Sequence, residues 1–429
     1  MTLLIKNGHL VDAAQKLDGA GYVFIKDGSI AASAPGTPPA SLHPDDVIDA
    51  RGMLVTPGFI DLHVHLREPG QESKETIESG CRAAVAGGFA SIVCMPNTVP
   101  TIDHASIVKF VHLEAQRVGL ANVFPAGTVS RDREGKELAD IGELATAGVV
   151  ALTDDGAPVM DAGLMLRALE YARMFGIAVM DHCEDPQLTN FGVMNEGFYS
   201  TKLGLRGIPS VCEDVMVARD ILLAEYTGGR IHIQHISTAH AVRMVREAKQ
   251  RGVHVTCEVT PHHFSLTDAA LSDYDTNFKM RPPLRAEEDR AALLRGIADG
   301  TIDAIATDHA PHTDTDKNVE FDYAADGVIG LESALPVAYT KLVKEGALPL
   351  MRLVELLTCG PAAIIGKDKK GTLRPGADAD VTIWNPNASY TIDAGAFRSK
   401  ARNCPFHGWA VNGKVIRTIV AGETKYEAV

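Results

Sequence analysis

Two histidines lie one residue apart in the run Asp61-Leu62-His63-Val64-His65, at the end of a short apolar segment. Side chains at positions i and i+2 of a β-strand point to the same face, so both imidazoles would face one point. Burying imidazoles among apolar residues costs free energy unless their nitrogens find partners, and a metal ion is such a partner. The alternative is a pair of hydrogen-bonded core histidines, and this pattern alone does not separate the two interpretations.

Imidazoles and carboxylates also end four later apolar runs. His182 ends IAVMDH, His235 ends IHIQH and Asp308 ends DAIATD, while Asp154 and Asp155 directly follow VVALT. Each residue alone is more often structural than functional. In a barrel of parallel strands, however, the carboxyl ends of all strands surround one centre, where the active sites of such barrels lie. The five runs together therefore predict a metal site.

The expected ligands are imidazoles and carboxylates without a thiolate, which suits zinc, with manganese or cobalt as alternatives. Six ligands are more than one tetrahedral zinc needs, and a pair of ions bridged by a carboxylate fits them better. We therefore expect two Zn²⁺ ions per chain. The seven cysteines are scattered and form no CxxC pair, so we expect buried thiols there and not metal ligands.

The strands that would carry these residues are short apolar runs, rich in β-branched residues, at 58–64, 91–96, 122–127, 149–154, 177–183, 231–236, 253–259 and 303–308. Such runs are typical of parallel strands buried on both faces. Between them, stretches such as GLMLRALEYARMFG carry apolar residues at helical spacing. The alternation predicts an α/β fold, a (β/α)8 TIM-type barrel over residues 57–366.

The sequence pattern at the two ends of the chain differs from that of the predicted barrel. LLIKNG, YVFIKDG and VIDARG near the start, and ADVTIW, WAVNGKV and RTIVAGETKY near the end, look like short strands. We expect Asn-Gly and Asp-Gly turns to join the first group. Neither group has enough strands for its own core. We therefore predict that residues 1–56 and 367–429 pair into one composite β-sandwich.

Length and charge narrow the class of protein. A chain of 429 residues suits one large barrel with a smaller lobe. Its formal charge of −14 argues against nucleic-acid binding. No apolar run reaches the roughly 18 residues of a membrane span. The first residues include Lys6 and Asp12 where a signal peptide needs an apolar core, so we expect a cytoplasmic protein.

Several motifs together resemble those of the bacterial class I dihydroorotases of the amidohydrolase superfamily. They are PGFIDLHVHLREPG (57–70), MPNT (95–98), TDDG (153–156), DHCED (181–185), EVTPHH (258–263) and ATDHAPH (306–312). The resemblance covers nearly the whole chain. It implies reversible hydrolysis of the cyclic amide of the small molecule (S)-dihydroorotate to N-carbamoyl-L-aspartate, in de novo pyrimidine (UMP) biosynthesis.

The resemblance also implies six metal ligands, namely His63, His65, Asp155, His182, His235 and Asp308. His63, His65 and Asp308 would bind the first zinc, and the other two histidines would complete the second. Strand alternation leaves Asp154 and Asp155 open as the bridging carboxylate. The family pattern selects Asp155, which precedes the histidine of the HCE motif by 182 − 155 = 27 residues. Asp308 would also be the catalytic proton carrier.

The implied substrate contacts lie beside these ligands. Arg67 and Asn97 would hold the substrate carboxylate, while His65 and His312 would also touch the substrate. The planar fork of Arg67 suits a carboxylate and stands two residues beyond the HxH pair. Its alternative is a surface salt bridge with a neighbouring glutamate.

Two positions depart from the family pattern. Arg281 stands where the family has the asparagine of FKMNPPLR, and Asp326-Gly327 stands where a Phe-Gly pair commonly lines the substrate ring. Both positions align with substrate contacts, so we include these three residues among the expected ones. Two interpretations stay open: the new charges compensate each other, or they indicate a somewhat different substrate.

Three functions compete. The first is an active dihydroorotase, and the second is another cyclic amidase, such as an allantoinase or a hydantoinase. The third is a non-catalytic, dihydroorotase-like partner of aspartate carbamoyltransferase. The other amidases usually bridge their metals with a carboxylated lysine, yet no lysine lies between Lys136 and Lys202. Non-catalytic relatives lose metal ligands, whereas this sequence keeps all six. The sequence leaves open a homodimer and an association with aspartate carbamoyltransferase.

Overall fold

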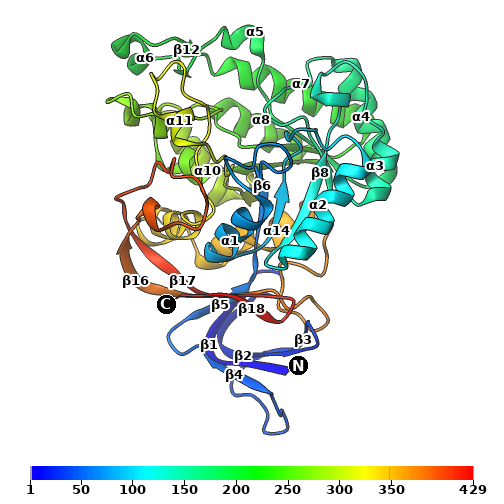
Figure 1. The fold of residues 1–429 in the computed structure, drawn as a ribbon, viewed down its shortest axis with the longest axis vertical. Helices are drawn as coiled ribbons and strands as arrows, with labels where there is room; N and C mark the ends of the chain where they lie inside the picture. Colours follow the sequence, from blue (N-terminus) through cyan, green and yellow to red (C-terminus); the bar gives the residue numbers. More distant parts are fainter. Residues whose placement is uncertain (1, 347, 429) are drawn as a thin grey trace.

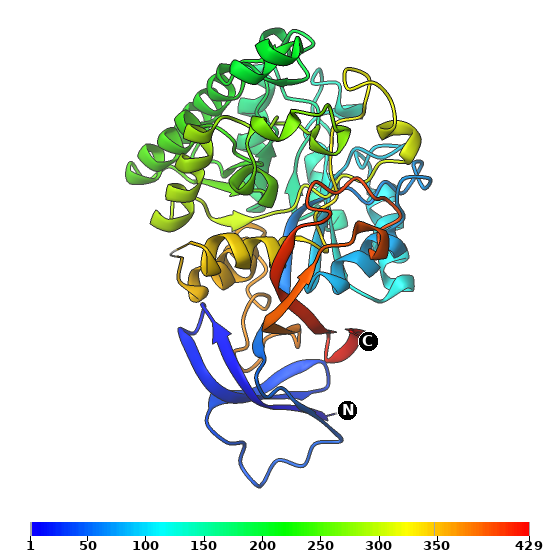
Figure 2. The same ribbon diagram turned by 90° about the vertical axis from the view of Figure 1, so that its left-hand side faces the viewer.

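The computed structural model describes residues 2–346 and 348–428. Most of its strands belong to two eight-stranded sheets (Figure 1). One sheet forms the centre of a barrel that is surrounded by helices, and the other is built from the two ends of the chain. Both views place the barrel above the terminal sheet, with the two termini in the lower part of the molecule (Figures 1 and 2).

The barrel strands follow one another around the sheet in sequence order, and each pairs in parallel with the next. They are β6 (Phe59–Val64), β7 (Phe89–Cys94), β8 (Asn122–Gly127), β9 (Ala151–Leu152), β10 (Ala178–Asp181), β13 (Ile231–Ile233), β14 (Val255–Val259) and β15 (Ala304–Ile305). Val64 pairs with His309 just beyond β15, which joins the first strand to the last. The predicted (β/α)8 fold is confirmed.

The longer helices that cover the barrel are α1 (Ile77–Ala86), α2 (Ala105–Val118), α3 (Ile141–Ala147), α4 (Ala162–Phe175), α7 (Val211–Thr227), α8 (Ala239–Gln250), α10 (Glu287–Asp299) and α13 (Leu350–Leu357). In α4, the Asp161 carboxylate accepts a hydrogen bond from Leu164 N, and left-handed Gly176 ends the helix. Among the described residues, no helix is long and apolar enough to cross a membrane.

Shorter helices lie in the connections, and several are near the carboxyl ends of the barrel strands. They are α5 (Pro186–Thr189), α6 (Phe198–Leu203), α9 (Pro261–Ser265), α11 (Asp314–Lys317), α12 (Ala334–Ala338) and α14 (Cys359–Ile364). The connection from β10 to α7 also holds a small parallel pair, β11 (Met194–Asn195) with β12 (Gly207–Ile208). Residues of these long loops can therefore line a binding pocket at one end of the barrel.

The terminal sheet has the order β18-β17-β16-β5-β1-β2-β3, with β4 paired to β1. Its strands are β1 (Thr2–Asp12), β2 (Leu17–Lys26), β3 (Ser29–Pro35), β4 (Asp46–Asp49), β5 (Leu54–Pro57), β16 (Val381–Thr391), β17 (Ala410–Val420) and β18 (Glu423–Glu427). The antiparallel pairing of β16 with β5 joins the two ends of the chain. The division at residues 56 and 367 stays a prediction.

One expected turn is wrong. Asp27-Gly28 does connect β2 to β3, but Asn7-Gly8 lies inside β1, where the pairing with β2 shifts register. Asn7 adopts a left-handed φ of 63°, a conformation that a β-bulge uses as readily as a turn. A side chain at Gly8 would meet Val55 at 2.5 Å, so the close approach of β5 also requires glycine.

Asp12, at the end of β1, ties the two terminal segments together. Its buried carboxylate accepts hydrogen bonds from the Thr372 hydroxyl at 3.0 Å and from Leu373 N at 2.6 Å. A backbone N–H buried without an acceptor is costly, so this carboxylate stabilises the segment that leads into β16.

Asp12→Ala should therefore destabilise the protein. Removing a charged acceptor and leaving a buried N–H without a partner should lower the free energy of unfolding by about 2–4 kcal/mol. Chemical denaturation measures the change. Asp273→Ala, at an exposed loop position, is the control and should stay within about 0.5 kcal/mol of wild type. Equal stability of the two variants would contradict a structural role for Asp12.

Candidate functional site

Five barrel strands bring six buried side chains to one end of the barrel. The side chains are those of His63, His65, Asp155, His182, His235 and Asp308. His63 lies on β6, and each of the others follows the carboxyl end of its strand. Because parallel strands of a barrel present these ends on one side, residues far apart in sequence meet there.

Asp155 lies at the centre of this cluster. Its Oδ1 is 3.1 Å from His63 Nε2, and its Oδ2 is 3.4 Å from His65 Nε2. The same Oδ1 is 3.9 Å from both His182 Nδ1 and His235 Nε2. Asp308 approaches from the other side, with Oδ1 3.1 Å from His65 Nε2. One carboxylate therefore faces four imidazoles, as a bridging residue would.

Two ring nitrogens in the cluster are left without hydrogen bonds. Within the described part of the chain, His235 Nδ1 has no hydrogen-bond partner, and His63 Nε2 lies 3.1 Å from Asp155 Oδ1 without a well-aligned hydrogen bond, although both nitrogens are buried. The ligand atoms of His63, Asp155 and His235, and those of His63, His65 and Asp308, lie within 4.8 Å of one another. Buried, unpartnered nitrogens beside carboxylates fit divalent cations, which would supply the missing partner.

The histidines and carboxylates of the cluster strongly shift one another's pKa values. Burial alone would lower the pKa of His63, but the carboxylates of Asp155 and Asp308 outweigh it and raise that pKa well above its usual value. Burial would likewise raise the pKa of Asp155, yet the surrounding imidazoles hold it well below its usual range. The cluster therefore favours an ionised carboxylate with positive charge close to it.

The neighbouring Asp154 faces away from the cluster. Its Oδ1 accepts hydrogen bonds from Val129 N at 2.9 Å and Ser130 N at 3.0 Å, and its Oδ2 accepts from the Ser130 hydroxyl. Asp154 thus fixes the loop after β8. Of the two residues that strand alternation left open, Asp155 is the one among the imidazoles.

Glu258 on β14 was missed in the sequence. Its Oε1 lies 2.9 Å from His63 Nδ1, and its Oε2 lies 3.1 Å from His232 Nε2. Burial would raise the pKa of Glu258, but hydrogen bonds from the two histidines lower it to about 2. Glu258 thus fixes the orientation of the His63 ring through Nδ1, the ring nitrogen that does not face Asp155. The signal was a carboxylate inside the otherwise apolar run 253–259.

A pocket of about 430 Å³ opens over the cluster. Every expected substrate residue lines it: His65, Arg67, Asn97, Arg281, His312, Asp326 and Gly327. Asn97 Oδ1 lies 2.9 Å from His65 Nδ1, so this side chain contacts a cluster histidine as well as the pocket. The structure thus brings all the substrate positions expected from sequence to one cavity.

Arg67 is buried beside the cluster. Its Nε donates to Pro311 O at 3.3 Å, and its Nη2 lies 3.5 Å from His312 Nε2. The alternative salt bridge is absent from the described residues, because Glu68 accepts from Ile77 N and Glu72 from Gly70 N. The guanidinium therefore remains available to a ligand in the pocket.

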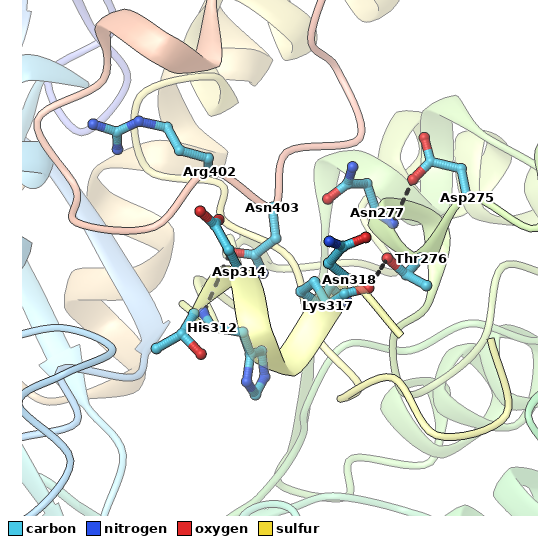
Figure 3. A pocket seen from close by; sticks show the side chains of 10 residues that line it. Asp275, Thr276, Asn277, His312, Asp314, Lys317, Asn318, Arg402 and Asn403 are labelled. Carbon is cyan, nitrogen blue, oxygen red and sulfur yellow. Dashed lines mark hydrogen bonds between the residues drawn. The ribbon is translucent and has the colours of Figure 1, made fainter. Parts of the chain in front are cut away.

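His312 is a neutral neighbour of this cation. Burial, with the charges of Arg67 and Lys74, lowers the pKa of His312 to about 3, and burial lowers the pKa of Arg67 to about 10. His312 Nε2 donates to Asp326 O at 2.8 Å, and His312 N donates to Asn403 Oδ1 at 3.3 Å (Figure 3). These two hydrogen bonds fix the loop that carries His312 on two sides.

Each of the three nitrogens of the Arg281 guanidinium donates a hydrogen bond to a protein acceptor. It donates from Nη1 to Glu184 Oε1 at 2.5 Å, from Nε to Asp326 Oδ2 at 3.0 Å and from Nη2 to Gly192 O at 3.0 Å. The ion pair with Asp326 is one of the two interpretations left open by the sequence. The second carboxylate, Glu184, was not foreseen, although it lies in the DHCED motif.

Comparison with known proteins agrees with this geometry. The family description "Dihydro-orotase-like" matches residues 52–241, and "Amidohydrolase family" matches residues 227–426. A dihydroorotase of Syntrophus aciditrophicus is 51% identical over 429 residues, 100% of both chains. One of Pelotomaculum thermopropionicum is 53% identical over 422 residues, 98% of both chains.

Solved structures show the same architecture. The L-hydantoinase (dihydropyrimidinase) of Arthrobacter aurescens has a TM-score of 0.87 at 25% identity, covering 100% of this chain and 97% of that one. A dihydropyrimidinase of Brevibacillus agri has a TM-score of 0.84 at 23% identity, with 99% and 95% covered. By its full-length relatives and its barrel-end cluster, the chain belongs to the dihydroorotase family of cyclic amidohydrolases.

Proposed function

We propose that this chain catalyses the reversible hydrolysis of (S)-dihydroorotate to N-carbamoyl-L-aspartate, with two zinc ions per chain. The observation that carries the proposal is the position of a buried arginine, Arg67, in the same pocket as the His–Asp cluster. A hydrolytic centre beside a fixed cation suits a cyclic amide that carries a carboxylate. The full-length relatives named dihydroorotase support the same reaction.

In the proposed site, His63, His65 and Asp308 would hold one zinc, His182 and His235 would hold the other, and Asp155 would be shared by both. When bound, such ions activate water at neutral pH and polarise the amide carbonyl. Glu258 holds His63 in the orientation that aims Nε2 at the centre. Asn97 orients the ring of His65 in the same way, by contacting His65 Nδ1.

Asp308 is the proposed proton carrier. It lines the pocket, and its Oδ1 lies 3.1 Å from His65 Nε2. A carboxylate in this position can accept the proton of the attacking water and deliver it to the ring nitrogen as the amide bond breaks. In the reverse direction, the same carboxylate takes the proton from the attacking nitrogen as the ring closes and returns it to the departing oxygen, which leaves as water.

Arg67, Asn97 and His312 are the proposed contacts of the substrate carboxylate. A buried guanidinium binds a carboxylate through two parallel hydrogen bonds, which neutral amidase substrates do not offer. Another part of the pocket wall is formed by Arg281, Asp326 and Gly327. We propose that these residues limit the space available to the substrate ring. A hydantoinase-type activity on uncharged rings would leave Arg67 buried without a counterion.

The first test joins metal content to turnover. Purified protein should contain about two zinc ions per chain and hydrolyse dihydroorotate, and chelation should abolish turnover until metal is restored. Asp308→Asn should lose turnover by at least about 100-fold, the usual scale of general acid–base catalysis, yet keep at least one metal. Metal analysis and single-substrate kinetics measure both. Metal-free protein with full activity would overturn the proposed site.

Arg67→Met should raise KM for dihydroorotate. Removing one partner of a buried charge pair costs about 2–5 kcal/mol, which corresponds to at least about 30-fold in KM. An uncharged cyclic amide such as dihydrouracil should show no comparable change. Arg117→Met, which removes an exposed arginine paired with Glu114, is the matched control. An unchanged KM in the Arg67 variant would place the carboxylate site elsewhere.

Arg281→Asn should weaken both substrate binding and stability. It leaves Glu184 and Asp326 without their common cation, so the pocket wall becomes more repulsive to an anionic substrate. We expect a higher KM and a loss of about 1–3 kcal/mol in unfolding free energy, because the pair is partly exposed. The double variant with Asp326→Asn should recover part of both losses. No recovery would show that the two charges act independently.

A further inference from the structure

A second concave surface lies on the outside of the barrel, between α1, β18 and the segment 397–402. We name it the basic groove. It has a volume of about 620 Å³. Its cationic side chains are Arg82, Arg398, Lys400, Arg402 and Lys425, and its rings are Phe397 and Tyr426. In Figure 1 this region lies where α1 approaches the C-terminal strand.

The positive charge of the groove contrasts with a protein whose formal charge is −14. Glu427 also lines the groove, but it pairs with Arg417. Arg82 forms an exposed pair with Glu78, and half-buried Lys425 pairs with exposed Glu423; ion pairs at the surface hold a side chain only weakly.

Two further arginines are available to a ligand. The guanidinium of Arg398 forms no ion pair within residues 2–346 and 348–428, although its backbone N donates to Glu332 at 2.7 Å. Arg402 uses only Nη1, which donates to the carbonyls of Ser399 and Ala401. A concave surface of one sign raises the local concentration of ions of the opposite sign.

Aromatic rings beside these cations specify the kind of anion. Phe397 and Tyr426 are half-buried and lie in the same groove as the arginines. Proteins hold nucleobases by stacking on such rings and phosphates by charge-assisted hydrogen bonds. The volume also falls in the range of roughly 300–1,000 Å³ that small-molecule sites occupy. We propose that the basic groove binds a nucleoside phosphate and that its occupancy is transmitted to the catalytic pocket.

The first connection to the pocket runs through Glu75. The Ser399 hydroxyl donates to Glu75 Oε2, which lies 3.4 Å from His309 Nε2. His309 follows the proposed proton carrier, and its carbonyl accepts a hydrogen bond from His65 N at 2.8 Å. Two residues, Glu75 and His309, thus connect Ser399 in the groove wall to the proposed metal ligand His65.

The second connection between the groove and the catalytic pocket runs through Asn403 and is shorter. Asn403 Nδ2 donates to Ala310 O at 3.0 Å and to Gly327 O at 3.1 Å, while its Oδ1 accepts from His312 N at 3.3 Å. Figure 3 shows Asn403 against the His312 loop and the guanidinium of its neighbour Arg402 turned away from that loop. Arg402 therefore lines the groove, and the next residue, Asn403, binds the backbone of loops that line the catalytic pocket.

A ligand bound to segment 397–402 would strengthen the restraint that Asn403 already places on the two loops. A more restrained pocket loses less entropy when the substrate binds, so occupancy of the groove should lower KM. This coupling rests on the proposed dihydroorotase activity. Binding at the groove does not, and it can be measured without turnover.

Calorimetry of the metal-loaded, full-length chain with ADP, UDP and inorganic pyrophosphate tests the site. We expect one nucleoside diphosphate per chain, with weaker binding of pyrophosphate, which lacks a base. Arg398→Gln with Lys425→Gln should weaken nucleotide binding by at least about 100-fold through the loss of two charge-assisted contacts. The control, Lys109→Gln with Arg295→Gln, removes two exposed cations outside the groove and should bind as wild type does.

Equal nucleotide binding by the two double variants would overturn the site and would assign any heat to metal chelation or to the catalytic pocket. Equal affinity for pyrophosphate and ADP would remove the role of the rings. In turnover assays, saturating ADP should lower KM by about fivefold or more in wild type and in the control variant, at the lower end of measured allosteric couplings. Nucleotide binding with an unchanged or higher KM would overturn the coupling alone.

Discussion

The carboxylate of Asp155 among four buried imidazoles is the interaction on which the site depends. Isolated in an apolar barrel, the carboxylate and the rings would each be costly to bury. Together they lie 3.1–3.9 Å apart; the imidazoles hold the pKa of Asp155 well below its usual range, and the carboxylates raise the pKa of His63 well above its own. The two buried ring nitrogens that make no hydrogen bond, on His63 and His235, show where this balance is incomplete and where a cation would complete it.

Holding that cluster requires unusual backbone. Arg67, His235 and Asp308 have φ values of 62°, 31° and 47°, in the left-handed region that side chains rarely adopt. Each such residue costs on the order of 1–3 kcal/mol. Hydrogen bonds between β6 and the end of β15, from His65 N to His309 O and from His309 N to His63 O, hold the strand ends despite this cost. These three residues stand where side chains must turn from the strand direction into the pocket.

Much of this arrangement follows from the sequence because it depends on local periodicity. Apolar runs predict the eight strands, and the two-residue repeat of a strand places His63 and His65 on one face. The position of Asp155 needed more than alternation, since Asp154 fits a strand end equally well. The family pattern selected Asp155, and the hydrogen bonds that bind Asp154 to residues 129 and 130 show how Asp154 is used instead.

The features that the sequence could not supply depend on long-range contacts. Glu184 lies 97 residues before Arg281, and no periodic pattern relates them. Glu258 was visible as a carboxylate in an apolar strand, but its partner His63 lies 195 residues away. The Asn7-Gly8 pair shows the reverse case, in which a local pattern permits two structures and only the pairing of β1 with β2 selects the bulge.

The terminal segments are more than a support for the barrel. The sequence placed residues 367–429 in a separate lobe, yet Asn403 donates to two loops of the pocket and Ser399 binds Glu75 behind His309. The pairing of β16 with β5 fixes the start of this segment, and β17 and β18 return it to the side of α1. The loops of a barrel are usually its most variable part. Here the C-terminal segment restrains those that carry His312 and Gly327, so the geometry of the pocket depends on contacts made outside the barrel.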